Sequence, residues 1–220
     1  MPINTQTMFQ EAIDQLKKLM PTLVILYLPA FGLLVLVALA SYISGVPVSK
    51  FTGDPALVMR AHPLVGVVSN IGVLLWSATV TICFFSAAHI RRKDEMRELY
   101  LFLLASGFFT MLLMFDDLFM LHDELFPEYL HFPQNLVYLV YMGIALFYLF
   151  RYRASILKTD YVLFFLALGF FALSVGMDFV QPNKAHALLS AHYLFEDGFK
   201  LLGITGWLGY FARTAFRAVG

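Results

Sequence analysis

Apolar residues along the chain fall into six long runs, with no short alternating stretches of the kind that form strands. A helix needs about 20 mostly apolar residues to cross the hydrocarbon core of a bilayer. Buried strands are shorter, at roughly 4–8 residues. The pattern therefore predicts six transmembrane helices, at about 21–43, 64–88, 99–121, 134–151, 160–180 and 189–212. Residues 5–20 are predicted to form an amphipathic helix that leads into the first span.

Composition supports this interpretation, because 60% of the residues are hydrophobic and only 14% are charged. Soluble domains carry about 25% charged residues, and a soluble chain this apolar would expose patches that aggregate. We expect one all-α integral membrane domain over residues 1–220, in the plasma (inner) membrane. The net charge is zero, so nothing favours a nucleic-acid partner. The single cysteine, Cys83, excludes an intramolecular disulfide.

The distribution of Lys and Arg between the loops predicts the orientation, because cytoplasmic loops are enriched in these residues. A cytoplasmic N-terminus places most of them on the cytoplasmic side. These are Lys17, Lys18, Arg91, Arg92, Lys93, Arg97, Arg151, Arg153, Lys158, Arg213 and Arg217. Only Lys50, Arg60 and Lys184 then lie outside, with Lys200 inside a span. Both termini are therefore predicted to be cytoplasmic.

The third and fifth spans have similar sequences at an offset of 62 residues. Leu101-Phe102 aligns with Leu163-Phe164 at this offset, and Asp116 aligns with Asp178. One interpretation is a duplicated two-helix unit, formed by spans three and four and repeated as spans five and six. The alternative is chance similarity between spans rich in Leu and Phe.

The third span ends in two adjacent acids, Asp116 and Asp117, and further acids and a histidine follow. A helix turns about 100° per residue, so the acids of this stretch share one face if the helix continues. They are Asp116, Asp117, Asp123 and Glu124. His122 points elsewhere unless the helix has ended.

The sixth span carries His192, Glu196 and Lys200 at a spacing of four residues, which places them in one stripe. Outward-running spans carry their acids near the end, and inward-running spans carry their polar groups near the beginning. All of these groups are therefore predicted to lie in one layer near the outer surface. Further members of the layer are Asp178 in the fifth span, Asn135 and Tyr138 in the fourth, and Asp197 in the sixth.

The acids of the layer outnumber its one amine, Lys200, so protonation, water, histidine or a metal cation must balance the charge. Carboxylates combined with imidazoles suit Zn, Mn or Fe. The predicted ligands of such an ion are Asp116, Asp178, His192 and Glu196. The remaining residues predicted to line the site are His122, Asp123, Asn135, Tyr138 and Asp197.

A bound metal would make an enzyme the first functional hypothesis, because it lowers the pKa of bound water. Asp117 or Glu124 would act as acid or base, and Lys200 would stabilise developing negative charge. The substrate would be a lipid or another hydrophobic molecule that enters between the helices. Hydrolysis is the first choice of reaction, and metal-dependent oxidation is the second.

Two alternatives to an enzyme stay open. The first is a proton- or cation-coupled transporter or channel, since intramembrane Asp, Glu, His and Lys form proton relays. Against it, the cytoplasmic half of the third span is apolar apart from Ser106 and Thr110. The second is a structural or accessory subunit in which Lys200 pairs with Asp178 or Asp116.

Overall fold

The computed structural model describes residues 5–53, 55–179 and 189–219, and every element in these ranges is helical. The long helices are α1 (Thr5–Ser44), α4 (Val67–Ile90), α5 (Arg97–Phe119), α6 (Gln134–Leu157), α7 (Tyr161–Phe179) and α8 (Leu189–Val219). The short elements are α2 (Val48–Thr52), α3 (Pro55–Val58), a 3₁₀ turn (Asp94–Met96) and a π-helical segment (Leu121–Tyr129). The predicted all-α class is confirmed.

Several helices are long and apolar enough to cross a membrane. Within the described ranges there are four, at Tyr27–Ser44, Val67–Ile90, Asp94–Phe119 and Gln134–Leu157. Helix α7 adds a shorter apolar stretch, Tyr161–Met177. Helix α8 carries charged residues towards both ends, which lower its mean hydropathy. The chain is thus compatible with a membrane protein, while the count of six spans and the orientation stay predictions.

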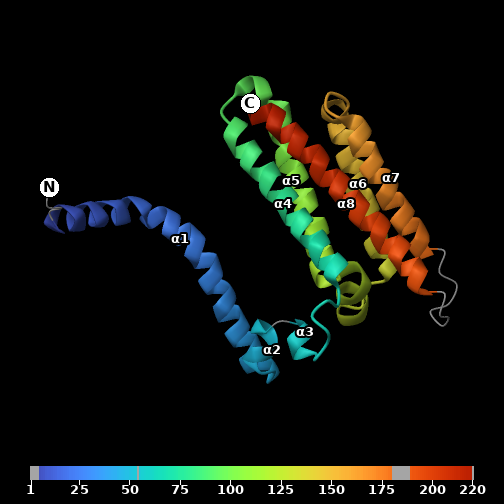
Figure 1. Cartoon of the computed structure of the whole chain (residues 1–220), viewed down its shortest axis with the longest axis horizontal. Helices are drawn as coiled ribbons and strands as arrows, with labels where there is room; N and C mark the ends of the chain where they lie inside the picture. The colour runs from blue at the N-terminus through green and yellow to red at the C-terminus, as the bar shows by residue number, and fades with distance from the viewer. Residues whose placement is uncertain (1–4, 54, 180–188, 220) are drawn as a thin grey trace. The chain divides into compact units, whose positions relative to one another are not determined.

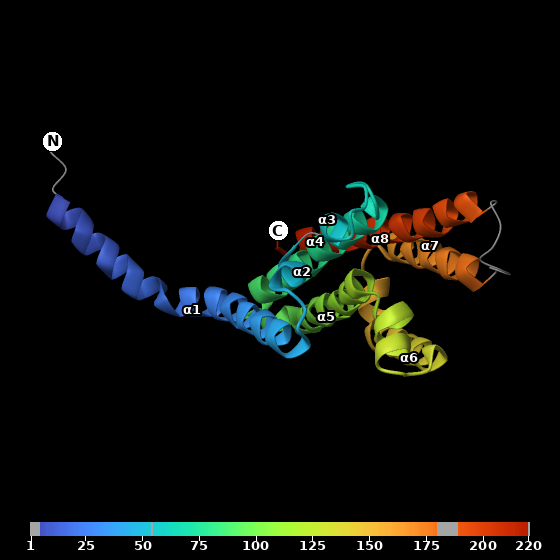
Figure 2. The same cartoon turned by 90° about the horizontal axis from the view of Figure 1, so that it is seen from below.

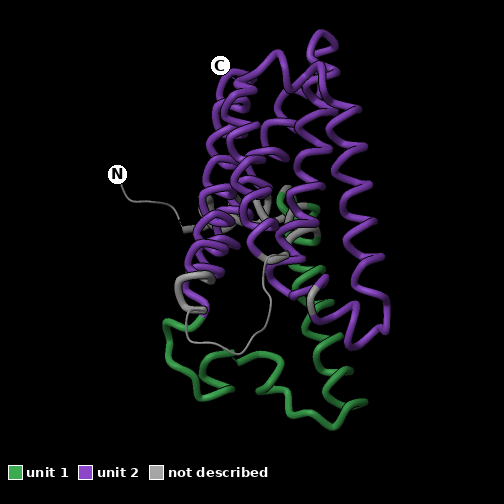
Figure 3. Tube along the Cα trace, turned by 90° about the vertical axis from the view of Figure 1, so that its right-hand side faces the viewer, with its two compact units in different colours: residues 1–65 green, residues 66–220 purple. Residues whose placement is uncertain are grey.

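The chain divides into two compact units, residues 1–65 and 66–220 (Figure 3). In the first unit, α1 joins the predicted amphipathic segment and the first predicted span in one continuous helix. Pro21 and Pro29 lie inside α1, and each removes a backbone hydrogen bond and favours a bend. Figure 1 shows α1 bending along its length. None of its 18-residue apolar window is buried.

The second unit is a bundle of five helices, in which α4 packs closely against both α5 and α8, and α7 packs closely against α8. Helix α6 makes sparser contacts with α5 and α7 (Figures 1 and 2). The five helices thus follow one another around a common core in chain order, and α8 returns beside α4.

Two glycines explain why helices α4 and α5, and helices α7 and α8, can lie so close together. A Cβ atom on Gly107 of α5 would lie 2.6 Å from the Phe84 ring of α4. A Cβ atom on Gly203 of α8 would lie 2.6 Å from the Phe171 ring of α7. Each ring therefore occupies the space that a side chain would need, as is common where membrane helices pack through small residues.

The interior of the bundle is largely aromatic. Trp207 of α8 lies at its centre and is 1% exposed. The Trp207 ring contacts Phe109 of α5 and Phe164 of α7, with centroid separations of 6.1 Å and 5.2 Å. Such tilted and edge-on pairs add to the stabilisation that comes from burying apolar area. This core fixes how far each helix is rotated about its axis, and so where the polar groups point.

Ion pairs hold the other end of the bundle, away from the predicted acidic layer. Arg151 of α6 pairs with Glu98 of α5 at 3.6 Å, and Arg213 of α8 pairs with Asp160 at 2.6 Å. Asp160 lies in the connection between α6 and α7, and it also accepts from Arg217 at 2.9 Å. Glu98 and Asp160 stand 62 positions apart, as do Arg151 and Arg213.

Candidate functional site

The candidate site begins where α5 ends, at Phe119. Met120 adopts a left-handed conformation with φ 49°, and its backbone N–H donates to the Asp116 carbonyl. A non-glycine residue rarely adopts this conformation, and here it turns the chain back towards the helix that it has just left. The acids were predicted to share one face only if the helix continued past Phe119, and this condition is not met. His122 is instead brought to Asp116.

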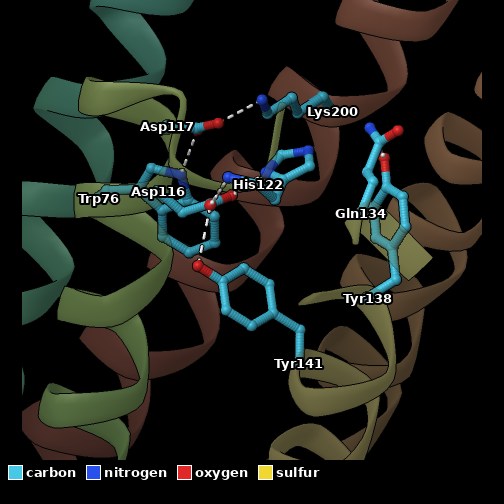
Figure 4. Close-up of polar contacts among 8 residues, drawn as sticks. All are labelled: Trp76, Asp116, Asp117, His122, Gln134, Tyr138, Tyr141 and Lys200. Atoms are coloured by element: carbon cyan, nitrogen blue, oxygen red, sulfur yellow. Dashed lines mark hydrogen bonds and ion pairs between the residues drawn. The ribbon is translucent and has the colours of Figure 1, made fainter. Parts of the chain in front are cut away.

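Asp116 is buried, with 7% of its surface exposed, and three donors converge on its carboxylate. His122 donates its backbone N–H at 3.1 Å, and its ring Nδ1 lies 2.5 Å from Asp116 Oδ2. Tyr141 of α6 donates its hydroxyl to Asp116 Oδ1 at 2.9 Å (Figure 4). Because a carboxylate only accepts hydrogen bonds, Nδ1 carries the proton in this contact. The contact thus fixes the orientation of the imidazole ring.

The side chain of Asp117 is 8% exposed, and it points to a different side of α5 from Asp116. The indole Nε1 of Trp76 on α4 donates to its Oδ2 at 2.8 Å. Lys200 of α8 forms an ion pair with its Oδ1 (Figure 4). Successive helical residues point about 100° apart, so two adjacent acids serve two separate networks. Among the described side chains, Lys200 therefore pairs with Asp117 and not with Asp116, whereas the expected alternative Asp178 has no described side chain.

A small cavity lies beside the Asp117–Lys200 pair. Its volume is about 40 Å³. That is room for about two or three water molecules, and too little for a lipid. The lining comes from α4, α5 and α8, and consists of Val68, Ser69, Gly72, Asp117, Asp197, Lys200, Leu201 and Ile204. The cavity therefore leaves room for water beside the ion pair.

Residues 27–214 match a protein family described as a domain of unknown function (DUF8692). The chain belongs to this family. The match runs from the apolar part of α1 to the last turns of α8, and it includes both networks around Asp116 and Asp117. No curated protein and no solved structure matches the chain.

The other predicted site residues of the DUF8692 chain lie around these networks. Glu196 is half-buried on α8, one turn before Lys200, whereas Asp197, Glu124 and Asn135 are exposed. The Tyr138 ring lies 5.5 Å from the His122 ring, centroid to centroid. The side chains of Asp123, Asp178 and His192 lie outside the described residues.

The predicted metal ligands are therefore only partly visible. Asp116 and Glu196 are described, whereas the side chains of Asp178 and His192 are not. Among the side chains that are described, no group of three or more His, Cys, Asp or Glu residues is arranged to hold a metal ion. The four-ligand set stays a prediction.

Sequence reasoning did not single out Trp76 and Tyr141, which complete the two networks. Tyr141 lies one turn beyond Tyr138, so it shares a face with a residue that was singled out. Trp76 gave no comparable signal. Because 16% of the residues are aromatic, a tryptophan that donates to a buried acid cannot be told from sequence apart from one that anchors the chain at the membrane surface.

Proposed function

We propose that this DUF8692 chain is a six-span protein of the plasma (inner) membrane with both termini cytoplasmic. The long apolar helices and the distribution of Lys and Arg support this topology. In a Cys83→Ala background, a cysteine at Arg60→Cys should react with a membrane-impermeant maleimide added to intact cells. A cysteine at Lys158→Cys should react only after the cells are lysed. The opposite labelling pattern would reverse the orientation.

The duplicated two-helix unit is part of the same proposal. Its support is that the offset of 62 residues relates the Glu98–Arg151 pair to the Asp160–Arg213 pair. It also relates Phe102 to Phe164, and both of these rings are fully buried. An offset that arose from chance apolar similarity would not be expected to carry an ion pair along with it.

The function that the site supports best is an enzyme that acts on a lipid-soluble substrate by general acid–base chemistry. The observation that carries this proposal is the 2.5 Å contact between Asp116 and His122 Nδ1. A buried carboxylate on one imidazole nitrogen orients the ring and stabilises its protonated form. The other nitrogen, Nε2, is then the atom that takes a proton from a nucleophile or binds a metal.

A divalent metal, Zn, Mn or Fe, is the proposed activator. Histidines that bind metals commonly donate their other ring N–H to a carboxylate, which is the relation between His122 and Asp116. In this scheme His122 joins the predicted ligands Asp178, His192 and Glu196, and Asp116 supports His122 instead of binding the ion. Lys200 interacts electrostatically with both Asp116 and Asp117, so it can stabilise a developing anion nearby. Hydrolysis is the proposed reaction.

The test compares two histidine variants purified in detergent. His122→Asn removes the imidazole held by Asp116, and His131→Asn removes an exposed histidine as the control. Metal content is measured by elemental analysis. Hydrolysis is followed with a fluorescent acyl ester, an acyl amide and a phospholipid. We expect His122→Asn to lose metal and hydrolysis, and His131→Asn to keep both.

Wild-type protein that carries no metal and cleaves none of the three probes would overturn the enzyme proposal. Equal metal content and equal rates in the two variants would remove His122 from it. A His192→Ala/Glu196→Ala double variant tests the predicted ligands in the same way. Unchanged metal in that variant would exclude them.

A further inference from the structure

From Asp117 towards the N-terminal end of α5, buried hydroxyl groups continue along the inner face of the helix. Thr110 lies seven residues before Asp117, and Ser106 lies four residues before Thr110. At about 100° per residue, these three side chains fall within about 40° of one another on the helix. Thr110 and Ser106 are both fully buried. The half of the bundle that looked apolar in sequence therefore holds a line of polar groups in its core.

A different helix supplies the partner of each hydroxyl. Trp207 Nε1 of α8 donates to Thr110 Oγ1 at 3.0 Å. Nearer the far end, the Tyr148 hydroxyl of α6 and Ser106 Oγ are 2.7 Å apart. These two contacts lie at successive depths, because their α5 residues are one helical turn apart, about 6 Å.

A third pair continues the line to the far surface. The Tyr210 hydroxyl of α8 lies 2.6 Å from Thr159 Oγ1, in the connection between α6 and α7. The Tyr148 hydroxyl also interacts electrostatically with Tyr210. Thr159 is followed directly by Asp160, which forms ion pairs at the surface with Arg213 and Arg217.

The Asp117 end of the line lies near the small cavity beside Asp117 and Lys200. That cavity is also lined by Ile204, which stands on α8 one turn nearer Trp207 than Lys200 does. The cavity therefore extends from the Asp117–Lys200 pair towards the Thr110–Trp207 contact. The line of hydroxyls thus has an acidic group near each end.

Holding helices together does not by itself explain the tyrosines. Ser106 already donates to the Phe102 carbonyl of its own helix at 2.6 Å, and Thr159 donates to the Ile156 carbonyl at 2.8 Å. Phenylalanine would fill the space of Tyr148 without the desolvation cost of a buried hydroxyl. Phenylalanine is common in this chain, at 23 residues. The use of tyrosine in its place at these depths therefore indicates a role for the hydroxyl groups other than packing.

We infer that Thr110 and the two hydroxyl pairs, Ser106–Tyr148 and Thr159–Tyr210, form a proton path between the acidic layer and the surface that carries Asp160. Each hydroxyl accepts a proton on its oxygen and releases its own proton to the next, and Ser106 and Thr159 first turn away from the backbone carbonyls to which they donate. Nothing is oxidised or reduced. Trp207 orients Thr110 and carries no proton itself. Ser106 and Thr110 stand one helical turn apart on α5, a gap that a bridging water can span. The inference does not depend on hydrolysis or on a metal.

Proton flux into liposomes tests the path. The purified full chain is reconstituted with a pH-sensitive dye inside, and a potassium gradient with valinomycin drives protons across the membrane. We expect a faster change in internal pH than in protein-free liposomes. Tyr148→Phe and Tyr210→Phe, which keep the rings and remove one hydroxyl each, should reduce the flux to the protein-free rate.

Tyr152→Phe is the matched control, because Tyr152 stands one turn from Tyr148 and its ring contacts the same Phe102 ring. It should conduct like the wild type. Melting curves check that each variant is folded, and Ser106→Ala replaces any tyrosine variant that is not. Wild-type flux at the protein-free rate overturns the path. So does flux retained in either folded tyrosine variant, because the pairs act in series, or flux lost in the control.

Discussion

The ion pair between Asp117 and Lys200 should lose different amounts of stability depending on which of its two partners is replaced. The side chain of Asp117 is 8% exposed, whereas that of Lys200 is 41% exposed. Removing one partner of a fully buried pair costs about 3–5 kcal/mol, because the other charge stays buried and unpaired. The cost should therefore depend on which partner is removed, since Asp117 is much the more buried of the two.

Lys200→Met leaves the Asp117 carboxylate buried, with Trp76 as its remaining donor. We expect a loss of about 3 kcal/mol, the low end of the buried range, because the cavity beside the pair admits water. Asp117→Asn leaves a half-exposed ammonium group, and we expect a loss of about 1 kcal/mol. At about 2–4 °C per kcal/mol for a chain of this size, Tm should fall by about 6–12 °C and about 2–4 °C, respectively.

Heating the protein in detergent and following tryptophan fluorescence measures this directly. The chain has two tryptophans, and both Trp76 and Trp207 are buried in the bundle. The double variant Asp117→Asn/Lys200→Met removes both charges and should melt above Lys200→Met alone. Lys158→Met, at an exposed position, controls for loss of an ammonium group. Equal losses in the two single variants, or a double loss equal to their sum, would refute the reasoning.

Two further predictions concern packing and pH. Gly203→Ala places a methyl group against the Phe171 ring and should lower the free energy of unfolding by about 1–3 kcal/mol, whereas Gly143→Ala, which meets nothing within 4 Å, should not. Hydrogen bonding from Arg213 lowers the pKa of Asp160. The stability that the ionised Asp160 contributes is therefore complete above its pKa in the unfolded chain, about 3.9. This contribution is lost as the pH falls through its lower pKa in the folded protein. Asp160→Asn should remove that acid-side loss, as melting curves across the range will show.

Much of the architecture is contained in the lengths of the apolar runs. A run of about 20 apolar residues can bury its backbone polar groups in lipid only as a helix, so the helices appear close to where the pattern places them. The polar spacing was also informative. Asp117 and Lys200 were expected in one layer, and they form an ion pair.

The sequence could not predict which acid meets which partner. Asp116 and Asp117 are chemically identical neighbours, and only the rotation of α5, set by the aromatic core, sends one to His122 and the other to Lys200. The helix end at Met120 was equally hidden, because no glycine or proline marks it. Without that turn, His122 would have pointed away from Asp116.

The chain by itself thus determined the all-helical class and the apolar lengths, because these follow from local composition and from a helical period that is always the same. Tertiary structure decided which polar groups touch. Hydroxyl contacts such as Ser106 with Tyr148 and Thr159 with Tyr210 join residues more than forty positions apart. Such pairings depend on how five helices rotate and approach one another, and packing around Gly107 and Gly203 sets that geometry, which no periodicity within a single helix encodes.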